Sequence, residues 1–480
     1  NNNTIQQSTI SAANSNSIFS LASFNNLYDR LKITATDNAA VFIAQSSSET
    51  FRQSSITALG LGAAAAVYIT AGSSNSFAQC ALNNFSGPMG VQLVLQSNYN
   101  VLSQSTVTSS ASSQPAFLAD TGSSSNTITQ SYILSNNGPA VKFNGGGFNT
   151  IVGSTLASPS PTSADHALNL VGSSSNTIIQ TVIIRTNGAP GRAVYIESES
   201  NGNAIILSSI TATGAAITFD RTSSNTVVAT FARGGQAAVE IRGSTGTRVA
   251  SSRLISDSFR GLNLIDGSNG LTLAASTVTA SSGFVGVYSA PNNSGAIDIS
   301  GNFVSGARSA IWFFATNAGS TLWITSNTLI PMASASGAQG ILLDGLLYGA
   351  TVQNNNVYYR SGVGTAAMDY IGMSFSNSLG LLIDHNRINH PNILTTGNFK
   401  GIKFDNVQNS SFKFNDVHSS GPVSIGYMVD LNNSTVTIRN NIFMSSMTDG
   451  GSGRTIFASL NSVVSADYNN YYSSNSAATL

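Results

Sequence analysis

Two acidic residues that follow short apolar segments, Glu197 and Asp220, are the first candidates for chemistry in this sequence. If the chain stacks these segments on one another, the two carboxylates become neighbours and Arg242 lies one layer further on. A pair of carboxylates can transfer protons to and from a substrate, or can bind Ca²⁺. The alternative is a surface ion pair beside a solvated acid. A calcium site needs more acidic groups, and only Glu199 in the adjacent loop is available.

Aromatic residues on the outward side of later segments form a second candidate. Tyr288 and Phe314 are expected to stack in one column, with Trp312 on the same outer face. Trp323 is expected to point outward from the first strand of the next repeat unit. Exposed aromatic rings can hold the apolar face of a sugar or dock another protein. The alternative is that a long loop covers them.

The remaining histidines and the single cysteine do not suggest a site. His166, His390 and His418 are scattered and share no metal-ligand spacing. Cys80 is expected to be a buried thiol. We therefore predict no metal site and no cofactor, with Ca²⁺ at the acidic pair as the one ion worth testing.

The elements that position these side chains follow from an internal repeat. The sequence Ser-Asn-Thr-Ile at 125–128 recurs in similar form at 148–151, 175–178 and 224–227. An apolar residue two places after the Asn marks repeat units of about two dozen residues along the whole chain. Each unit contains three short segments of alternating apolar and polar residues, separated by Gly, Ser and Asn, which is typical of short β-strands.

One unit illustrates the pattern, with strands predicted at 176–180, 182–185 and 193–197. Strands this short cannot form a long-stranded sandwich. They can form a coil in which each turn pairs with the next one, ~4.8 Å away. The side chains of this unit that are expected to point inward are Ile178, Val182, Ile184, Val194 and Ile196.

Asparagine recurs at fixed places in the repeat. Stacked amides can hydrogen-bond to one another as a ladder, and Asn also tolerates the left-handed backbone of a sharp corner. The positions two residues before the marker are Asn3, Asn25, Asn75, Asn126, Asn149, Asn176, Asn203, Asn225 and Asn269. In the C-terminal half a second ladder is predicted after the first strand, at Asn302, Asn327, Asn386 and Asn441, with Asn356 one place off.

The sequence therefore predicts an all-β fold, a single right-handed parallel β-helix of about 18–20 turns with three short strands per turn and Asn ladders at its corners. We expect 1–480 to form one continuous domain with longer loops between 330 and 400. Neither end shows an amphipathic cap helix. We therefore expect a segment of a longer protein, or a chain that stacks end to end with others.

Composition restricts the partners. Only 8% of the residues are charged, and 20 Lys and Arg balance 20 Asp and Glu, whereas an ordinary soluble protein has roughly 25% charged residues. Nucleic acids and anionic membranes attract a basic excess, which is missing, so neither is expected as a partner. The longest apolar stretch is too short to insert into a bilayer. Composition favours an extracellular or cell-surface location.

The repeat resembles the right-handed parallel β-helix proteins of the pectin-lyase-like superfold. The resemblance rests on the recurring Asn-x-Ile followed by Gly-Ile-x-Leu-like segments, such as 340–343 and 401–404, and it covers essentially the whole chain. The ending at 466–472 resembles segments of very large bacterial surface proteins. The superfold includes polysaccharide lyases, glycoside hydrolases, phage tailspikes and adhesins, so the resemblance does not choose among activities.

Within that superfold, the run at 381–386 resembles a short motif of pectate lyases. The resemblance implies that Asp384, which precedes His385, is a calcium ligand and that a later turn supplies the base, for example Lys403 or Lys413. The sequence departs from the motif, because the expected stacked neighbours of Asp384 are Asn355 and Asn415 rather than carboxylates.

Three functional hypotheses remain. The first is a non-enzymatic rod, a structural stalk or an adhesin-like binding surface for an extracellular glycan or another surface protein. The second is a polysaccharide lyase or glycoside hydrolase that uses the weak acidic candidates. The third is a non-catalytic carbohydrate-binding face centred on Trp312. The missing acid cluster favours a non-enzymatic role.

Overall fold

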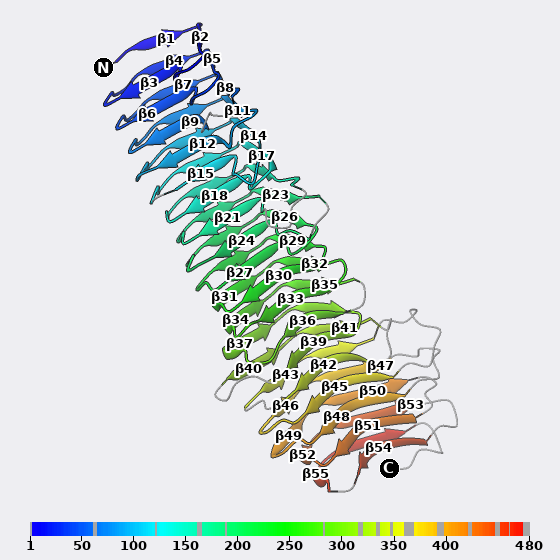
Figure 1. Ribbon diagram of the computed structural model, residues 1–480. Helices are drawn as coiled ribbons and strands as arrows, with labels where there is room; N and C mark the ends of the chain where they lie inside the picture. Colours follow the sequence, from blue (N-terminus) through cyan, green and yellow to red (C-terminus); the bar gives the residue numbers. More distant parts are fainter. Residues whose placement is uncertain are drawn as a thin grey trace. The chain divides into compact units, whose positions relative to one another are not determined.

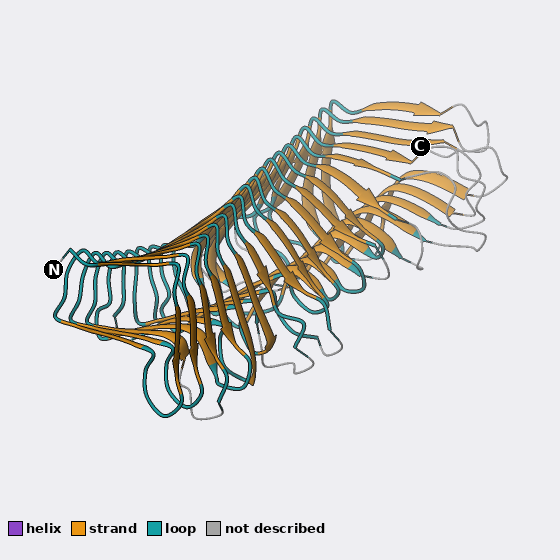
Figure 2. Ribbon diagram, turned by 90° about the horizontal axis from the view of Figure 1, so that it is seen from above, coloured by secondary structure: helices purple, strands orange, loops and turns teal. Residues whose placement is uncertain are grey.

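The computed structural model describes residues 2–473, apart from 61–64, 121, 161–165, 188–189, 282–283, 315–319, 333–336, 346–348, 360–368, 391–397, 421–424, 447–451 and 460. Every regular element in this described part is a β-strand (Figure 2). Much of the predicted long-loop region between 330 and 400 lies outside it. The described residues include no helix long and apolar enough to cross a membrane.

The chain divides into two compact units, Asn1–Gly235 and Gln236–Leu480. Within each unit the strands repeat in sets of three, and each strand pairs in parallel with the equivalent strand of the next turn (Figure 1). The three classes contain 19, 19 and 18 described strands. Both units are right-handed parallel β-helices, and the predicted fold class is confirmed.

One turn of the first unit shows how sequence becomes structure. Its strands are β22 (Thr177–Ile179), β23 (Val182–Arg185) and β24 (Val194–Glu197). They pair with β25 (Ala204–Ile206), β26 (Ser209–Ala212) and β27 (Ile217–Asp220) of the next turn. The predicted strands match these bounds to within a residue or two.

The prediction of inward side chains was right for the first and third strands and wrong for the second. Ile178, Val194 and Ile196 are buried, but β23 buries Ile183 and Arg185 and leaves Val182 exposed. The cause is the corner residue Gln180, whose φ of 49° is left-handed. A left-handed residue reverses the chain direction and shifts the alternation by one place.

The same left-handed corner precedes the second strand in turn after turn. In the first unit it is mostly Gln, and the exposed side-chain amides of Gln53, Gln79, Gln104 and Gln130 hydrogen-bond in a row at 3.1–3.2 Å. In the second unit the position is filled by varied residues. They include Ser326, Asn354, His385, Phe414, Asn440 and Tyr468, with φ between 51° and 58°.

A buried asparagine ladder runs before the first strand in the first unit. From Asn75 through Asn100 and on to Asn225, each Asn donates its backbone N–H and its side-chain amide to the Oδ1 of the next, at 2.8–3.2 Å. The six predicted members from Asn75 to Asn225 are therefore confirmed, whereas Asn100 was not predicted, because the core position in its turn is Leu102 and not Val101. Asn25 was the wrong member, because it is the left-handed corner residue and Asn26 points inward.

In the second unit the amide ladder lies at the other corner, after the first strand. Ser276 donates to Asn302, and the ladder then continues without a break. Its members are Asn302, Asn327, Asn355, Asn386, Asn415, Asn441 and Asn469. The predicted change of corner is confirmed. Asn356 is an exposed neighbour of the true member Asn355, and Asn269 begins a strand, where its backbone N–H bonds to Ser244.

The third strands of the second unit need glycine near their start. A Cβ on Gly340 would lie 2.5 Å from the carbonyl oxygen of Gly372, and one on Gly372 would lie 2.4 Å from that of Gly401. Successive third strands therefore pack closely at this point, which explains the Gly-Ile-x-Leu part of the repeat. The residues that follow alternate between the core and the outer face.

Candidate functional site

The outer face of the third strands in the second unit carries the predicted aromatic cluster. Tyr288 lies on β36 (Val285–Ser289), and Trp312 and Phe314 lie on β39 (Ser309–Phe314). The ring centroids are 5.9 Å apart for Tyr288 and Trp312, 5.9 Å for Tyr288 and Phe314, and 5.0 Å for Trp312 and Phe314. The three rings therefore form one contiguous cluster.

The register of the cluster differs from the predicted one. Tyr288 pairs with Trp312, and Phe314 pairs with Asp344 on the following strand. The prediction had placed Tyr288 directly below Phe314. The error of two residues leaves both side chains on the same face, since side chains two apart along a strand point the same way. The contact between the rings is therefore retained.

Two arginines lie on these rings. The guanidinium of Arg260 is 3.4 Å from the ring centroid of Tyr288, and that of Arg308 is 4.5 Å from the centroid of Trp312. Burial lowers the pKa of Arg260, and its Nη1 donates to Asn263 at 2.8 Å. Arg260 covers Tyr288, which is 9% exposed, whereas Trp312 and Phe314 are partly exposed.

Arg308 differs from Arg260 because it is exposed. No carboxylate among the described residues lies within ion-pair distance of it. Next to it, the indole Nε1 of Trp312 is buried without a hydrogen-bond partner in the described chain. The cluster thus offers two partly exposed rings and one cation without an ion-pair partner among the described residues, whereas the Trp312 N–H lies beneath the surface.

Cation–aromatic pairs concentrate on the third strands in both units. In the first unit Arg192 lies 4.7 Å from the ring of Tyr195 on β24. In the second unit a further group lies on β48 (Phe399–Asp405), β51 (Ile425–Asn432) and β54 (Ser452–Ala458). Its pairs are Lys400 with Tyr427 at 6.0 Å and Arg454 with Phe457 at 5.4 Å. These cations were not predicted from the sequence, because they lie at or before the strand entries and not within the alternating segments.

Trp323 does not join the cluster. It lies on β40 (Thr321–Thr325) in the first class of strands, between Asp298 and Thr351 in register. Its side chain points outward as predicted and is 40% exposed. It therefore provides an isolated aromatic residue on a different face.

The acidic pair is adjacent as predicted, but the carboxylate of Asp220 is already engaged. Glu197 and Asp220 are register partners. The hydroxyl of Tyr195 donates to Asp220 Oδ2 at 2.7 Å, and Arg221 Nε lies 3.3 Å from Oδ1. Burial and these acids raise the pKa of Tyr195. In the second unit, Arg242 forms ion pairs with Asp266 and Glu240.

The predicted surroundings of Asp384 were wrong. Asp384 on β46 (Leu382–Asp384) lies between Gln353 and Lys413 in register, because Asn355 and Asn415 stack on the inward Asn386 instead. His385 Nδ1 lies 2.8 Å from Asp384 Oδ1. The His385 ring stacks on Phe414 with centroids 5.0 Å apart. This corner therefore places an imidazole close to a carboxylate, but it has no second carboxylate in register.

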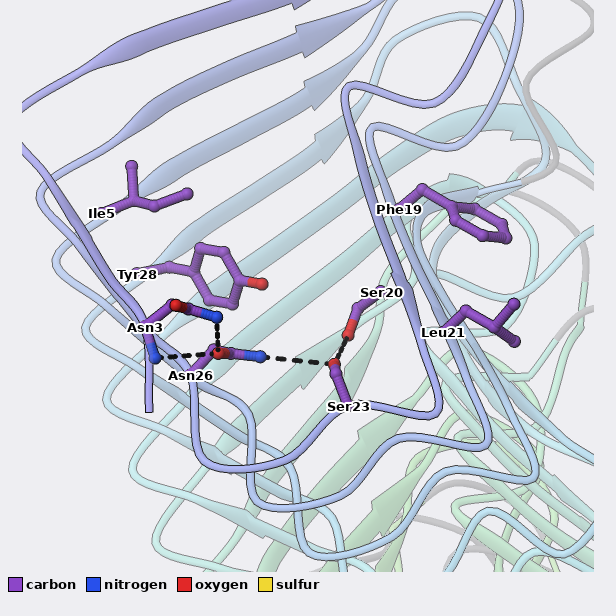
Figure 3. A pocket seen from close by; sticks show the side chains of 8 residues that line it. All are labelled: Asn3, Ile5, Phe19, Ser20, Leu21, Ser23, Asn26 and Tyr28. Carbon is purple, nitrogen blue, oxygen red and sulfur yellow. Dashed lines mark hydrogen bonds between the residues drawn. The ribbon is translucent and has the colours of Figure 1, made fainter. Parts of the chain in front are cut away.

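A cavity of about 310 Å³ lies in the first turns of the first unit (Figure 3). The amide side chains that line this cavity, those of Asn3 and Asn26, belong to the first turns of the amide ladder. Asn26 Nδ2 donates to Ser23 and to the buried Glu49, which replaces an amide in the column. Burial and Glu49 raise the pKa of Tyr28 to about 12. The lining residues are Asn3, Ile5, Phe19, Ser20, Leu21, Ser23, Asn26 and Tyr28.

His166, His390 and Cys80 are buried. Burial lowers the pKa of His166 to about 3 and that of His390 to about 4, and it raises the pKa of the Cys80 thiol to about 11. Cys80 is buried, as the sequence predicted. Among the described residues, no group of three His, Cys, Asp or Glu side chains gathers to hold a metal ion.

Comparison with known proteins gives structural likenesses only. No family model and no curated protein matches the sequence. The PL6-family alginate lyase AlyGC is 9% identical, with a TM-score of 0.45, over 94% of this chain and 96% of that one. The periplasmic alginate epimerase AlgG is 13% identical, with a TM-score of 0.30, over 79% and 77%. The Dettilon tailspike protein is 13% identical, with a TM-score of 0.30, over 78% and 62%. No conclusion about activity rests on them.

Proposed function

We propose that this chain is a non-enzymatic, extracellular or cell-surface β-helix that binds carbohydrate on the third strands of its second unit. The observation that carries the proposal is the cluster of Tyr288, Trp312 and Phe314 with Arg308 beside it. Sugar rings have apolar faces that pack on aromatic rings, and hydroxyl groups that accept hydrogen bonds from donors such as the exposed Arg308 guanidinium. The strands hold these side chains rigidly, which favours recognition.

Replacing the central ring is expected to abolish binding. Trp312→Ala removes the ring that contacts both Tyr288 and Phe314. We expect at least a tenfold loss of affinity, because aromatic residues dominate such surfaces. A glycan array with the full chain identifies the ligand, and calorimetry with that glycan measures the change. Trp323→Ala is the matched control and is expected to bind normally. An empty array, or equal binding by Trp312→Ala, contradicts the proposal.

A second candidate function is lyase activity on a uronic-acid polymer. It is favoured by the 2.8 Å approach of His385 to Asp384 and by Lys413, the register neighbour of Asp384. In such a reaction the neutral imidazole would take the C5 proton of the uronate, and the C5 electron pair would form the C4–C5 double bond. The oxygen on C4 would leave with a proton from water, and the lysine would neutralise the substrate carboxylate.

This second candidate has a direct test. The elimination creates a carbon–carbon double bond conjugated to the carboxylate, which absorbs in the ultraviolet. If the chain is a lyase, Asp384→Asn is expected to lower turnover on the preferred polymer about 10²-fold or more, because the imidazole loses its orienting charge. If the unmodified chain produces no absorbing product from alginate or polygalacturonate, this function is excluded for those polymers.

A further inference from the structure

The second unit has two cation–aromatic clusters on one line of side chains. The first contains Trp312 with Arg308, and the second contains Phe457 with Arg454 and Tyr427 with Lys400. Strand register places Trp312, Leu342 and Ser374 in consecutive positions, followed by Lys403, Asp430 and Phe457. Trp312 belongs to the first cluster and Phe457 to the second. Five strand spacings separate them, or roughly 24 Å along the helix axis. The two clusters therefore lie on one outer face, in line with each other.

Both lysines between the clusters are paired with carboxylates of the protein. Lys400 Nζ lies 2.8 Å from Asp430 Oδ2, and Lys403 Nζ lies 3.3 Å from Asp405 Oδ2. Ser376 Oγ donates to Asp344 at 2.7 Å. The middle of the line thus presents two ion pairs and hydroxyl groups, and the carboxylate of Asp344 leaves one negative charge among these groups.

The charges at the two ends are different. Arg308 over Trp312 and Arg454 over Phe457 are exposed, and within the described residues neither forms an ion pair. These two guanidinium groups flank the two ends of the line, although only 8% of the residues in the chain are charged. Guanidinium groups bind carboxylate and sulfate oxygens in a two-pronged geometry.

We infer that the ligand is a linear anionic polysaccharide that lies along the third strands and contacts both clusters. This inference rests on the proposed carbohydrate-binding function and extends it. The aromatic rings hold sugar faces at the two ends, and the unpaired arginines bind acidic groups there. A polymer that reaches both ends gains affinity, because the second contact forms within an existing complex. A short oligosaccharide contacts one end only.

Binding as a function of ligand length tests the inference. The probes are size-fractionated oligosaccharides of polygalacturonate, alginate and hyaluronate, each beside its carboxyl-reduced, uncharged form. With the full chain we expect affinity to rise with length until the oligosaccharide spans roughly 24 Å. Arg454→Gln is expected to remove that rise, at least tenfold for long chains, and to leave short ones unchanged. Arg308→Gln is expected to weaken both.

The control is Arg248→Gln, which removes an exposed arginine from β31 (Thr245–Ala250) in the first class of strands. It is expected to bind every probe as the unmodified chain does. The inference is overturned if Arg454→Gln matches the unmodified chain at all lengths, if the uncharged polymers bind as tightly as the acidic ones, or if polyglutamate binds as well as the best polysaccharide. Loss of all glycan binding in the unmodified chain would instead overturn the proposed function itself.

Discussion

Asn355→Ala is expected to destabilise the second unit by about 3 kcal/mol or more. Asn355 Nδ2 donates to Ile324 O at 2.7 Å and to Asn386 Oδ1 at 3.0 Å, and its Oδ1 accepts two hydrogen bonds from Asn327. All of these groups are buried. Alanine leaves several of them without partners, at about 1–3 kcal/mol each. Urea unfolding followed by tryptophan fluorescence measures the loss, because Trp312 and Trp323 both lie in this unit.

The neighbouring asparagine provides the control. Asn356→Ala changes the same residue type one position later, but the side chain of Asn356 is exposed. A surface substitution of this kind is expected to change stability by less than about 0.5 kcal/mol. If the two variants unfold at the same urea concentration, the ladder does not stabilise the fold as argued.

Acid is expected to destabilise the second unit through His390, and His390→Phe is expected to remove that effect. His390 is completely buried, and its ring centroid lies 4.7 Å from that of Phe399 and 5.2 Å from that of Tyr370. Burial lowers its pKa to about 4, with a smaller contribution from His418, while the backbone of Ser420 opposes the shift. Phenylalanine fits among these rings and carries no ionisable group.

The pH window follows from the sign of the shift. The unfolded chain binds a proton on His390 near pH 6.5, whereas the folded chain binds it only near pH 4. The unfolded state therefore holds more protons between these values, and stability falls as the pH decreases from 6.5 towards 4. The full loss is about 3 kcal/mol. This loss of stability is absent above pH 6.5, the pKa of His390 in the unfolded chain.

Denaturant unfolding at pH 7 and at pH 4.5 measures this effect. The unmodified chain is expected to lose more stability between the two conditions than His390→Phe does. His418→Gln is the control, because His418 is partly exposed and hydrogen-bonds to Asn389 rather than lying in the core. Equal acid sensitivity in the unmodified chain and His390→Phe would rule out His390 as the source.

The fold could be predicted from the sequence because the repeat constrains a few positions in every turn. Asn126, Asn149 and Asn176 must pair with the next amide, so their spacing is visible without coordinates. The apolar residue two places later must fill the core, and Ile128 and Ile178 are buried accordingly. The same residue types therefore recur at the same interval along the chain, and this interval can be counted in the sequence.

The errors arose where the backbone breaks the alternation. Asn25 and Gln180 are left-handed corner residues, and counting through them at period two assigns Asn26 and Ile183 to the wrong side. The register of Tyr288 shifted for a related reason, because turns of different length join the strands. The cluster was still found, since an error of two residues keeps a side chain on its face.

The arginines of the cluster could not be placed from strand patterns. Arg308 precedes β39, so it falls outside the alternating segment, and its contact with Trp312 depends on a long side chain that folds back over the strand. Whether Arg308 has an ion-pair partner depends on the charged side chains of every neighbouring turn. Properties of this kind belong to the assembled surface rather than to any one stretch of sequence.

The amide ladder has a consequence for how such proteins evolve. Each interior Asn of the ladder in the second unit makes the same hydrogen bonds to the turn before and the turn after. The Asn of a duplicated turn could therefore form these hydrogen bonds with both of its neighbouring turns. Insertion or deletion of whole turns should therefore be tolerated more readily than insertion of a few residues. Natural relatives are expected to differ in length by multiples of one turn, with substitutions accumulating freely on their outward positions.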